Sequence, residues 1–153
     1  MDPAIIQLDD SVTDLATKRM LQNVIERKRK FDRLKKKHFR TTIVTLILGL
    51  LLILYIYILY VRPYSSSLLD VLTEFMGHNT SLLYCTVAFG VYGYMLILKK
   101  KMDKAEKEYH ALRCEIVDRS KDLWKQENAW KERHKIFQVM KEMYDINLFH
   151  QNK

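Results

Sequence analysis

Three side chains that can bind a metal ion lie at helical spacing in the second half of the chain. Glu106, His110 and Cys114 follow one another at i, i+4 and i+8, so a helix would place them on one face. Zinc takes three or four protein ligands, and the sequence has no second cluster of suitable ligands to complete such a site. We therefore expect a mixed polar helix surface at these positions, with no metal and no other cofactor.

The rest of the sequence has no pattern that predicts catalysis. It contains no glycine-rich phosphate loop, and no nucleophile stands in a motif with a neighbouring base. Cys85 lies in an apolar stretch and Cys114 in a charged one, so a structural disulfide is not expected. We expect a protein that is not an enzyme and that has no small-molecule substrate.

The elements that would carry these residues are long helices. With 153 residues the chain has room for one domain, and its four Gly and two Pro leave few places where a helix would be interrupted. The net charge is +8, but two apolar stretches, 41–61 and 80–98, contain no charged residue at all. The sequence predicts an all-α protein.

Both apolar stretches have about the length of a transmembrane helix. At about 1.5 Å per residue, 41–61 reaches roughly 30 Å, the thickness of the hydrocarbon core of a bilayer. A chain of this size has no core that could surround an uncharged helix of that length. Stretch 80–98 is less apolar, so a re-entrant or surface segment stays an alternative there. Small residues predict a close approach of the two helices: Thr42, Thr45 and Gly49 in the first, and Thr86, Gly90 and Gly93 in the second.

Lys and Arg gather beside both apolar stretches, on the side away from the loop that joins them. The joining loop, 62–79, has one basic residue, Arg62. Because Lys and Arg accumulate on the cytoplasmic side of spans, this asymmetry predicts a two-span hairpin with both termini in the cytoplasm. Anionic lipid headgroups would attract the same side chains, and nucleic-acid binding is not needed to explain them. The residues expected to set the topology are Arg27, Lys28, Arg29, Lys30, Lys35, Lys36, Lys37, Arg40, Lys99, Lys100 and Lys101.

The loop between the stretches contains a predicted amphipathic helix. Ser67 is placed to cap it, Asp70 stands in its first turn and Gly77 is placed to end it. Such a helix would lie on the outer membrane surface or merely cover the ends of the spans, and the sequence does not decide between the two. Its apolar side chains share one face: Leu68, Leu69, Leu72, Phe75 and Met76.

A heptad pattern follows the second apolar stretch. From Met102 to Tyr144, a heptad register with alternating steps of three and four has apolar residues at all seven a positions and at three of the six d positions. This pattern predicts one long helix with coiled-coil packing. Trp124 falls off this seam and is expected on the surface. The seam residues that we expect to make contacts are Tyr109, Leu112, Ile116, Leu123, Trp130, Phe137 and Met140.

The seam has two candidate partners. One is the N-terminal helix of the same chain, packed antiparallel, which would leave the distal Trp130 and Phe137 free for another protein. The other is a second copy of the chain, in a parallel homodimer through the same seam. Equal distances from the membrane set the antiparallel register, and its pairs include Phe31 with Tyr109 and Val24 with Ile116.

Along most of its length the sequence resembles the YpbF-like family of small, uncharacterised two-pass membrane proteins of Bacillus-type bacteria. The features that carry the resemblance are the start "LDDSVTDLATKRMLQNVIERKRKFDRLKKKH", the two apolar stretches and the closing "WKQENAWKERHKIFQVMKEMYDI". The resemblance is one of pattern, and it implies a bacterial cell membrane. No activity is established for that family, so the resemblance assigns no functional residues.

The protein expected from these patterns is an all-α, two-pass membrane protein. It would present a coiled-coil-like cytoplasmic stalk for protein–protein interaction, as a scaffold or accessory protein. The alternatives are a holin-like pore former, which would depolarise cells, and a membrane tether for nucleic acid, which would bind with steep salt dependence. Its expected parts are the N-terminal basic helix 1–40, the first transmembrane helix 41–61, the external loop 62–79, the second transmembrane helix 80–98 and the C-terminal heptad helix 99–153.

Overall fold

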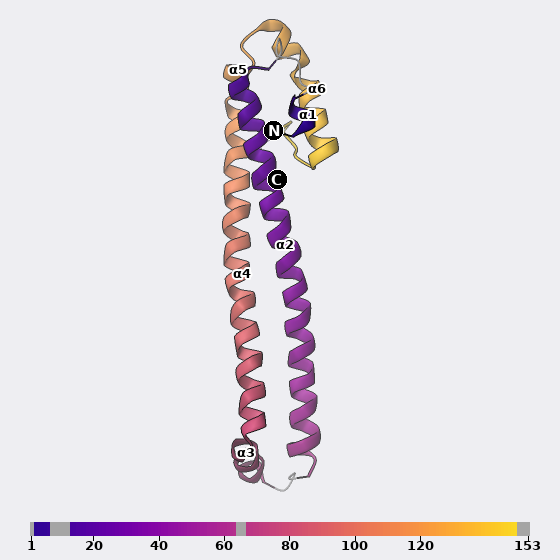
Figure 1. Cartoon of the computed structure of the whole chain (residues 1–153), viewed down its shortest axis with the longest axis vertical. Helices are drawn as coiled ribbons and strands as arrows, with labels where there is room; N and C mark the ends of the chain where they lie inside the picture. The colour runs from indigo at the N-terminus through magenta and orange to yellow at the C-terminus, as the bar shows by residue number, and fades with distance from the viewer. Residues whose placement is uncertain (1, 7–12, 64–66, 150–153) are drawn as a thin grey trace. The chain divides into compact units, whose positions relative to one another are not determined.

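The regular elements of the chain are helices. The structure, a computed structural model, describes residues 2–6, 13–63 and 67–149, and no strand occurs among them. The all-α prediction is therefore confirmed for this part of the chain. In order, the elements are α1 (Pro3–Ile6), α2 (Leu15–Ile56), the π-helical turn η1 (Tyr57–Val61), α3 (Leu68–Gly77), α4 (Asn79–Asp118), α5 (Ser120–Leu123) and α6 (Glu127–Tyr144) (Figure 1).

The chain divides into two compact units, each of which is built from parts distant in sequence. One, here called the terminal unit, comprises Met1–Leu34 and Met102–Lys153. The other, the apolar unit, comprises Lys35–Lys101. Each of the long helices α2 and α4 has one end in the terminal unit and the other end in the apolar unit. A helix boundary near residue 40 does not exist, because α2 is continuous through the basic residues.

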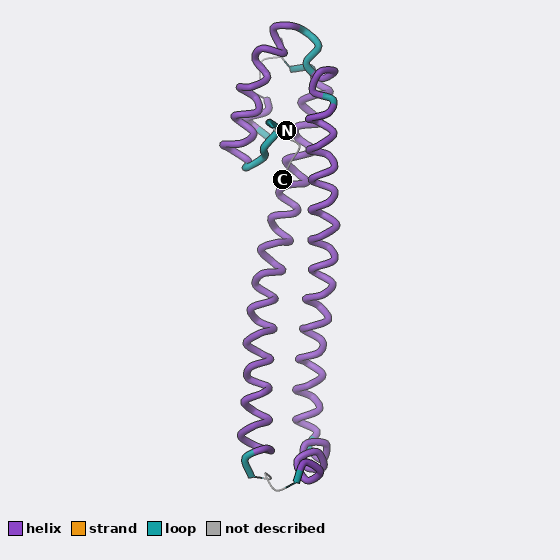
Figure 2. The backbone as a smooth tube through the Cα atoms, turned by 180° about the vertical axis from the view of Figure 1, so that it is seen from behind, coloured by secondary structure: helices purple, strands orange, loops and turns teal. Residues whose placement is uncertain are grey.

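The terminal unit has a hydrophobic core of its own. Side chains from α1, α2, α4 and α6 meet in it, and the segment after α6 adds Ile146 and Leu148. Both views show α6 beside the part of α2 that belongs to this unit (Figures 1 and 2). The predicted pair Phe31 and Tyr109 is in contact, with parallel rings whose centroids lie 6.3 Å apart. The fully buried members of the core include Ile5, Leu21, Val24, Ile25, Ile116, Trp124 and Met140.

The prediction of one continuous helix from Met102 to Tyr144 is wrong. The chain leaves the helix at Arg119 (φ −85°, ψ 8°) and again at Trp124 (φ −121°, ψ 62°), and α6 then begins at Glu127. The reason is burial, since a straight helix would extend beyond its shorter partner, α2, and leave its distal apolar residues in water. Folding back buries those residues at the cost of a few backbone hydrogen bonds.

The fold-back also corrects the expected positions of the aromatic side chains. Trp124 is 1% exposed, not on the surface, and its ring meets that of Phe137 edge-on with centroids 5.4 Å apart. Phe137 is buried too, so the prediction that the distal end of the seam stays free is wrong. All seven predicted seam residues belong to the core of the terminal unit or pack against it.

The apolar unit contains the two helical segments that are long and apolar enough to cross a membrane. They lie within Leu15–Val61 and Asn79–Asp118. In the most apolar 18-residue window of the first, no residue is buried, and in that of the second 11% of the residues are. Side chains such as Leu46, Leu50 and Ile53 are thus not covered by the part of the chain that the structure describes.

Aromatic and cation–π contacts join the two helices of the apolar unit. The rings of Tyr55 and Tyr84 stack with centroids 5.6 Å apart, and the Lys37 ammonium lies 5.7 Å from the centroid of the Tyr94 ring. Tyr60 is buried, and its hydroxyl hydrogen-bonds the hydroxyl of Ser81. The predicted close approach through small residues is wrong for the glycines, because a Cβ atom at Gly49, Gly90 or Gly93 would meet no atom within 4 Å.

Threonine hydroxyls in these segments are satisfied within their own helix. Thr42 and Thr45 donate to the carbonyl oxygens of His38 and Thr41, at 2.9 and 2.8 Å. Thr86 does the same to a carbonyl oxygen one turn earlier, at 2.8 Å. Such bonds leave no polar hydrogen without a partner on these side chains, which a low-dielectric environment requires.

Helix α3 has the predicted bounds. It runs from Leu68 to Gly77, with Asp70 in its first turn and an extended residue, His78, after it. Ser67 has the extended backbone of an N-cap, but its side chain makes no capping hydrogen bond. The position of Ser67 therefore predicted the start of the helix although its hydroxyl does not stabilise it there. Asp10 and Ser11 have side chains that could cap the N-terminal helix, and both lie outside the described residues.

Candidate functional site: a charged cleft between α2 and α6

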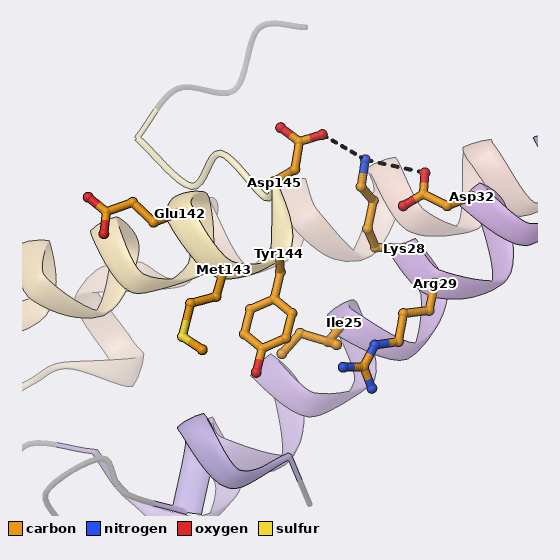
Figure 3. Close-up of a pocket in the computed structure, with 8 residues that line it drawn as sticks. All are labelled: Ile25, Lys28, Arg29, Asp32, Glu142, Met143, Tyr144 and Asp145. Atoms are coloured by element: carbon orange, nitrogen blue, oxygen red, sulfur yellow. Dashed lines mark hydrogen bonds and ion pairs between the residues drawn. The ribbon is translucent and has the colours of Figure 1, made fainter.

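A cleft of about 350 Å³ lies in the terminal unit, where α2 passes the end of α6 (Figure 3). Lys28, Arg29 and Asp32 come from α2, and Glu142 and Met143 come from the last turns of α6. Charged groups from two helices therefore meet over an apolar floor. The complete lining is Ile25, Lys28, Arg29, Asp32, Glu142, Met143, Tyr144 and Asp145.

One wall of the cleft is an ion-pair bridge centred on Lys28. Its ammonium lies 3.4 Å from a carboxylate oxygen of Asp32, one turn later on α2, and 3.2 Å from one of Asp145. It also lies 5.6 Å from the centroid of the Tyr109 ring. Since the Lys28 side chain is 14% exposed, this cation is largely withdrawn from water and depends on these partners.

Asp145 reaches Lys28 because the backbone turns sharply there. It ends α6 in the left-handed region (φ 56°, ψ 38°), which Asp tolerates better than most residues. Its N–H donates to the carbonyl oxygen of Lys141 at 3.1 Å, as in an αL cap. The turn directs the following residue, Ile146, into the core, where it is fully buried.

A second cluster of polar contacts holds the N-terminus beside the cleft. The Asp2 carboxylate accepts a hydrogen bond of 2.7 Å from the Tyr144 hydroxyl and one of 2.6 Å from the Arg29 guanidinium. The Asp2 backbone N–H donates to the Gln22 side chain at 2.9 Å. These bonds fix the start of α1, whose Ile5 inserts into the core.

Contacts in the two clusters shift the pKa values of Asp2, Tyr144 and Lys28. The hydrogen bond from Tyr144 and the nearby Arg29 lower the pKa of Asp2. Burial and the hydrogen bond to Asp2 raise the pKa of Tyr144 to about 12. Partial burial opposes the charge on Lys28, but the Asp145 and Asp32 carboxylates outweigh it and raise the pKa of Lys28. At neutral pH Asp2 is thus ionised, Lys28 is charged and Tyr144 is neutral.

Four of the residues predicted to set membrane topology take part in these contacts of the terminal unit. Lys28 and Arg29 line the cleft, and Arg27 and Lys30 both pair with Glu108 of α4. Together they lower the pKa of Glu108 against the opposing effect of burial. The spacing of Lys28 and Asp32 could have indicated one of these pairs, because residues at i and i+4 face each other on a helix. The pairs with α4 and α6 have no such signal.

The polar stripe on α4 contains one close pair, His110 and Glu106, which approach to 3.9 Å. No group of three or more metal-binding side chains occurs among the described residues. Cys114 is half-buried and is not disulfide-bonded. An ordinary polar helix surface without a metal stays a prediction.

The cleft combines paired charges with an apolar floor. Lys28 is paired with Asp32 and Asp145 of the lining, and Arg29 is paired with Asp2 beside it. Met143, which lines it, is 63% exposed, and the Ile25 side chain beneath is apolar. A flexible thioether over an apolar floor can adapt to the side chain of a partner, while the surrounding charges orient it.

Two comparisons connect the chain with known sequences. Residues 20–151 match the family described as protein of unknown function (DUF2663). The chain is also 37% identical over 145 residues to "Uncharacterized protein YpbF" of Bacillus subtilis (strain 168), an alignment that covers 94% of this chain and 95% of the relative. No solved structure matches the chain significantly. Because the family model matches residues 20–151, which is most of the chain, the protein belongs to the DUF2663 family.

Proposed function

We propose that this protein is a two-pass membrane protein that presents a helical cytoplasmic unit for contacts with other proteins. In this proposal residues 41–61 and 80–98 cross the bilayer as an antiparallel hairpin. The terminal unit then lies on the cytoplasmic side, and the segment 62–79 lies outside. The protein acts as a scaffold or accessory protein, without catalysis.

The observation that carries the proposal is the absence of cover on the apolar segments. The first window has no buried residue, and Leu50 and Ile53 are each about two-thirds exposed. Each such side chain left in water forgoes roughly 1.5 to 3 kcal/mol of hydrophobic stabilisation. Lipid removes this cost along the whole helix at once, and the internally bonded threonine hydroxyls are compatible with it.

The orientation follows from the charges that flank the segments. Lys35, Lys36 and Lys37 before the first segment and Lys99 and Lys100 after the second are all exposed. The loop 62–79, at the other end of both segments, contains a single Lys or Arg, which is Arg62. Translocation of basic residues is unfavourable, so the basic end stays in the cytoplasm, where anionic headgroups attract it.

Contact with another protein is assigned to the cleft between α2 and α6. The heptad seam is occupied by packing within the chain, so it does not serve this purpose. The exposed Met143 and the charged rim of the cleft provide an apolar anchor surrounded by polar groups, which is the usual organisation of a recognition site.

Topology reporters test the membrane part of the proposal. Fusions at either end of the chain are expected to report a cytoplasmic location, and an insertion within 65–67 an external one. The protein should stay in the membrane pellet after alkaline carbonate extraction. An external C-terminus, or release by carbonate, would contradict the proposal.

Site-specific photocrosslinking tests the interaction part. A photoreactive residue at Met143 is expected to give a discrete adduct in intact cells. The matched control is Lys121 of α5, an exposed residue of the same unit that does not line the cleft. Equal adducts at both positions, or none at Met143, would contradict a binding role of the cleft.

A further inference from the structure

We infer that α3 is an interfacial helix whose apolar face inserts into the outer lipid leaflet beside the ends of the two spans. The inference rests on the proposed two-span topology and goes beyond it, because the topology alone allows a helix that merely covers the span ends. Its ligand is a lipid surface.

The exposure of the apolar face is the first observation. Leu68 is 86% exposed and Leu69 is 77% exposed, and Leu72 and Met76 are 57% and 63% exposed. At 100° per residue these four side chains fall within one side of the helix. No residue of α3 is buried, and the part of the chain that the structure describes does not cover these four side chains.

The opposite face of α3 is polar, and Thr73 and Glu74 on it have partners one turn away. Asp70, Thr73 and Glu74 project from it. The Thr73 hydroxyl donates to the carbonyl oxygen of Leu69 at 2.8 Å, and Glu74 lies 3.1 Å from His78. A helix with one apolar and one charged face is suited to the boundary between acyl chains and water.

Contacts with the end of the first apolar segment fix the rotation of α3. The ring of Phe75 meets that of Tyr60 edge-on, with centroids 5.4 Å apart, and the His78 ring lies 6.2 Å from the same tyrosine. Tyr60 is itself held by a hydrogen bond to Ser81 of α4. Phe75, at one edge of the apolar face, therefore contacts the protein, while the other four apolar side chains of that face stay exposed.

The covalent chain keeps α3 near the membrane boundary. Only His78 separates it from α4, which begins at Asn79. From Val61 to Leu68 there are seven residue steps, which span at most about 25 Å when fully extended. Once both segments are in the bilayer, the apolar face of α3 has lipid within reach at all times, whereas a soluble partner would have to arrive by diffusion.

Spin labels at matched positions test the inference. In a Cys85→Ser, Cys114→Ser background, single cysteines replace Leu72 on the apolar face and Asp70 on the polar face of the full chain. The protein is reconstituted into vesicles of phosphatidylethanolamine and phosphatidylglycerol. Collision of each nitroxide with oxygen, which concentrates in lipid, is compared with collision with a water-soluble nickel chelate.

We expect the label at Leu72→Cys to collide mainly with oxygen and the label at Asp70→Cys mainly with the nickel chelate. Similar nickel access at both positions would overturn the inference, because α3 would then lie in water. A Leu72→Cys label shielded from both reagents would also overturn it, since a protein would occupy the face.

A third label, at Leu50→Cys in the first apolar segment, separates the two proposals. It should collide with oxygen and hardly with nickel, whatever α3 does. Nickel access at Leu50→Cys would refute the two-span proposal and the inference with it. Lipid exposure at Leu50→Cys combined with an aqueous Leu72→Cys would refute the inference alone.

Discussion

Replacing Trp124 by alanine should destabilise the terminal unit strongly. The indole is 1% exposed and belongs to the core, and its ring packs edge-on against Phe137. Truncation of a buried Trp to Ala typically costs about 3 to 5 kcal/mol, of which roughly 0.5 to 1.5 kcal/mol is the aromatic contact. On the sequence-based expectation of an exposed Trp124, the same change would cost almost nothing.

The expected loss is large enough to measure by thermal unfolding in detergent. For a unit of this size, about 1 kcal/mol shifts the midpoint by roughly 4 to 8 °C, so Trp124→Ala should lower it by about 12 °C or more. The signal for both proteins is near-ultraviolet circular dichroism, because Trp130 contributes to the fluorescence as well as Trp124.

Trp124→Phe is the matched control. It keeps an aromatic ring beside Phe137 and removes an indole N–H that has no hydrogen-bond partner within the described part of the chain. The expected loss is therefore below about 2 kcal/mol. An alanine variant that unfolds with the wild-type midpoint would refute the fold-back of α6. So would a Trp124 that iodide quenches like free tryptophan in a Trp130→Phe background, where it is the one tryptophan left.

Three further predictions concern charge. Tyr144→Phe removes the hydrogen bond to Asp2 and should cost about 1 to 2 kcal/mol, measured by the same unfolding assay. In the wild type, the lowered pKa of Asp2 gives stability that is present above its unfolded pKa of about 4 and lost as the pH falls. The raised pKa of Tyr144, about 12, gives stability that is present below about pH 10 and lost as the pH rises towards 12. Tyr144→Phe should weaken both pH dependences, and unchanged profiles would contradict the assigned contact. Replacing Lys99–Lys101 with Glu should increase the fraction of chains with an external C-terminus in a reporter assay, and an unchanged orientation would leave the N-terminal basic residues in sole control. Alanine at His110 or Cys114 should change the free energy of unfolding by less than about 0.5 kcal/mol, with and without a chelator. An unfolding midpoint of the wild type that depends on the chelator would restore the metal hypothesis.

The sequence predicted those parts of the fold that depend on local pattern. The helical class followed from the scarcity of Gly and Pro, and the bounds Leu68–Gly77 of α3 followed from its amphipathic spacing and its final glycine. The contact between Phe31 and Tyr109 followed from matching two apolar stripes. Each of these depends on residues that are close in sequence or on one simple register.

The parts that the sequence did not predict depend on competition between distant segments. The heptad spacing continues past Trp124, but the helix does not. The same spacing is compatible with one straight helix and with two helices folded together. What decides is the extra area that α6 buries on α2 and α4, and spacing has no information about that. The contact of Asp2 with Tyr144 is likewise a product of the fold-back, and no local signal precedes it.

The division of the terminal unit between the two ends of the chain has a consequence for biosynthesis. Asp2 and Tyr144 are 142 positions apart, so on the ribosome this unit stays incomplete until the last helix has emerged. In the proposed topology the apolar segments are made earlier and can enter the membrane first. The segment 35–101 then acts as a tether that makes closure of the unit intramolecular, at an entropic cost that grows only with the logarithm of its length. A single proteolytic cut between residues 62 and 67 would remove this tether, so in that topology two separate fragments would have to find each other in the plane of the membrane.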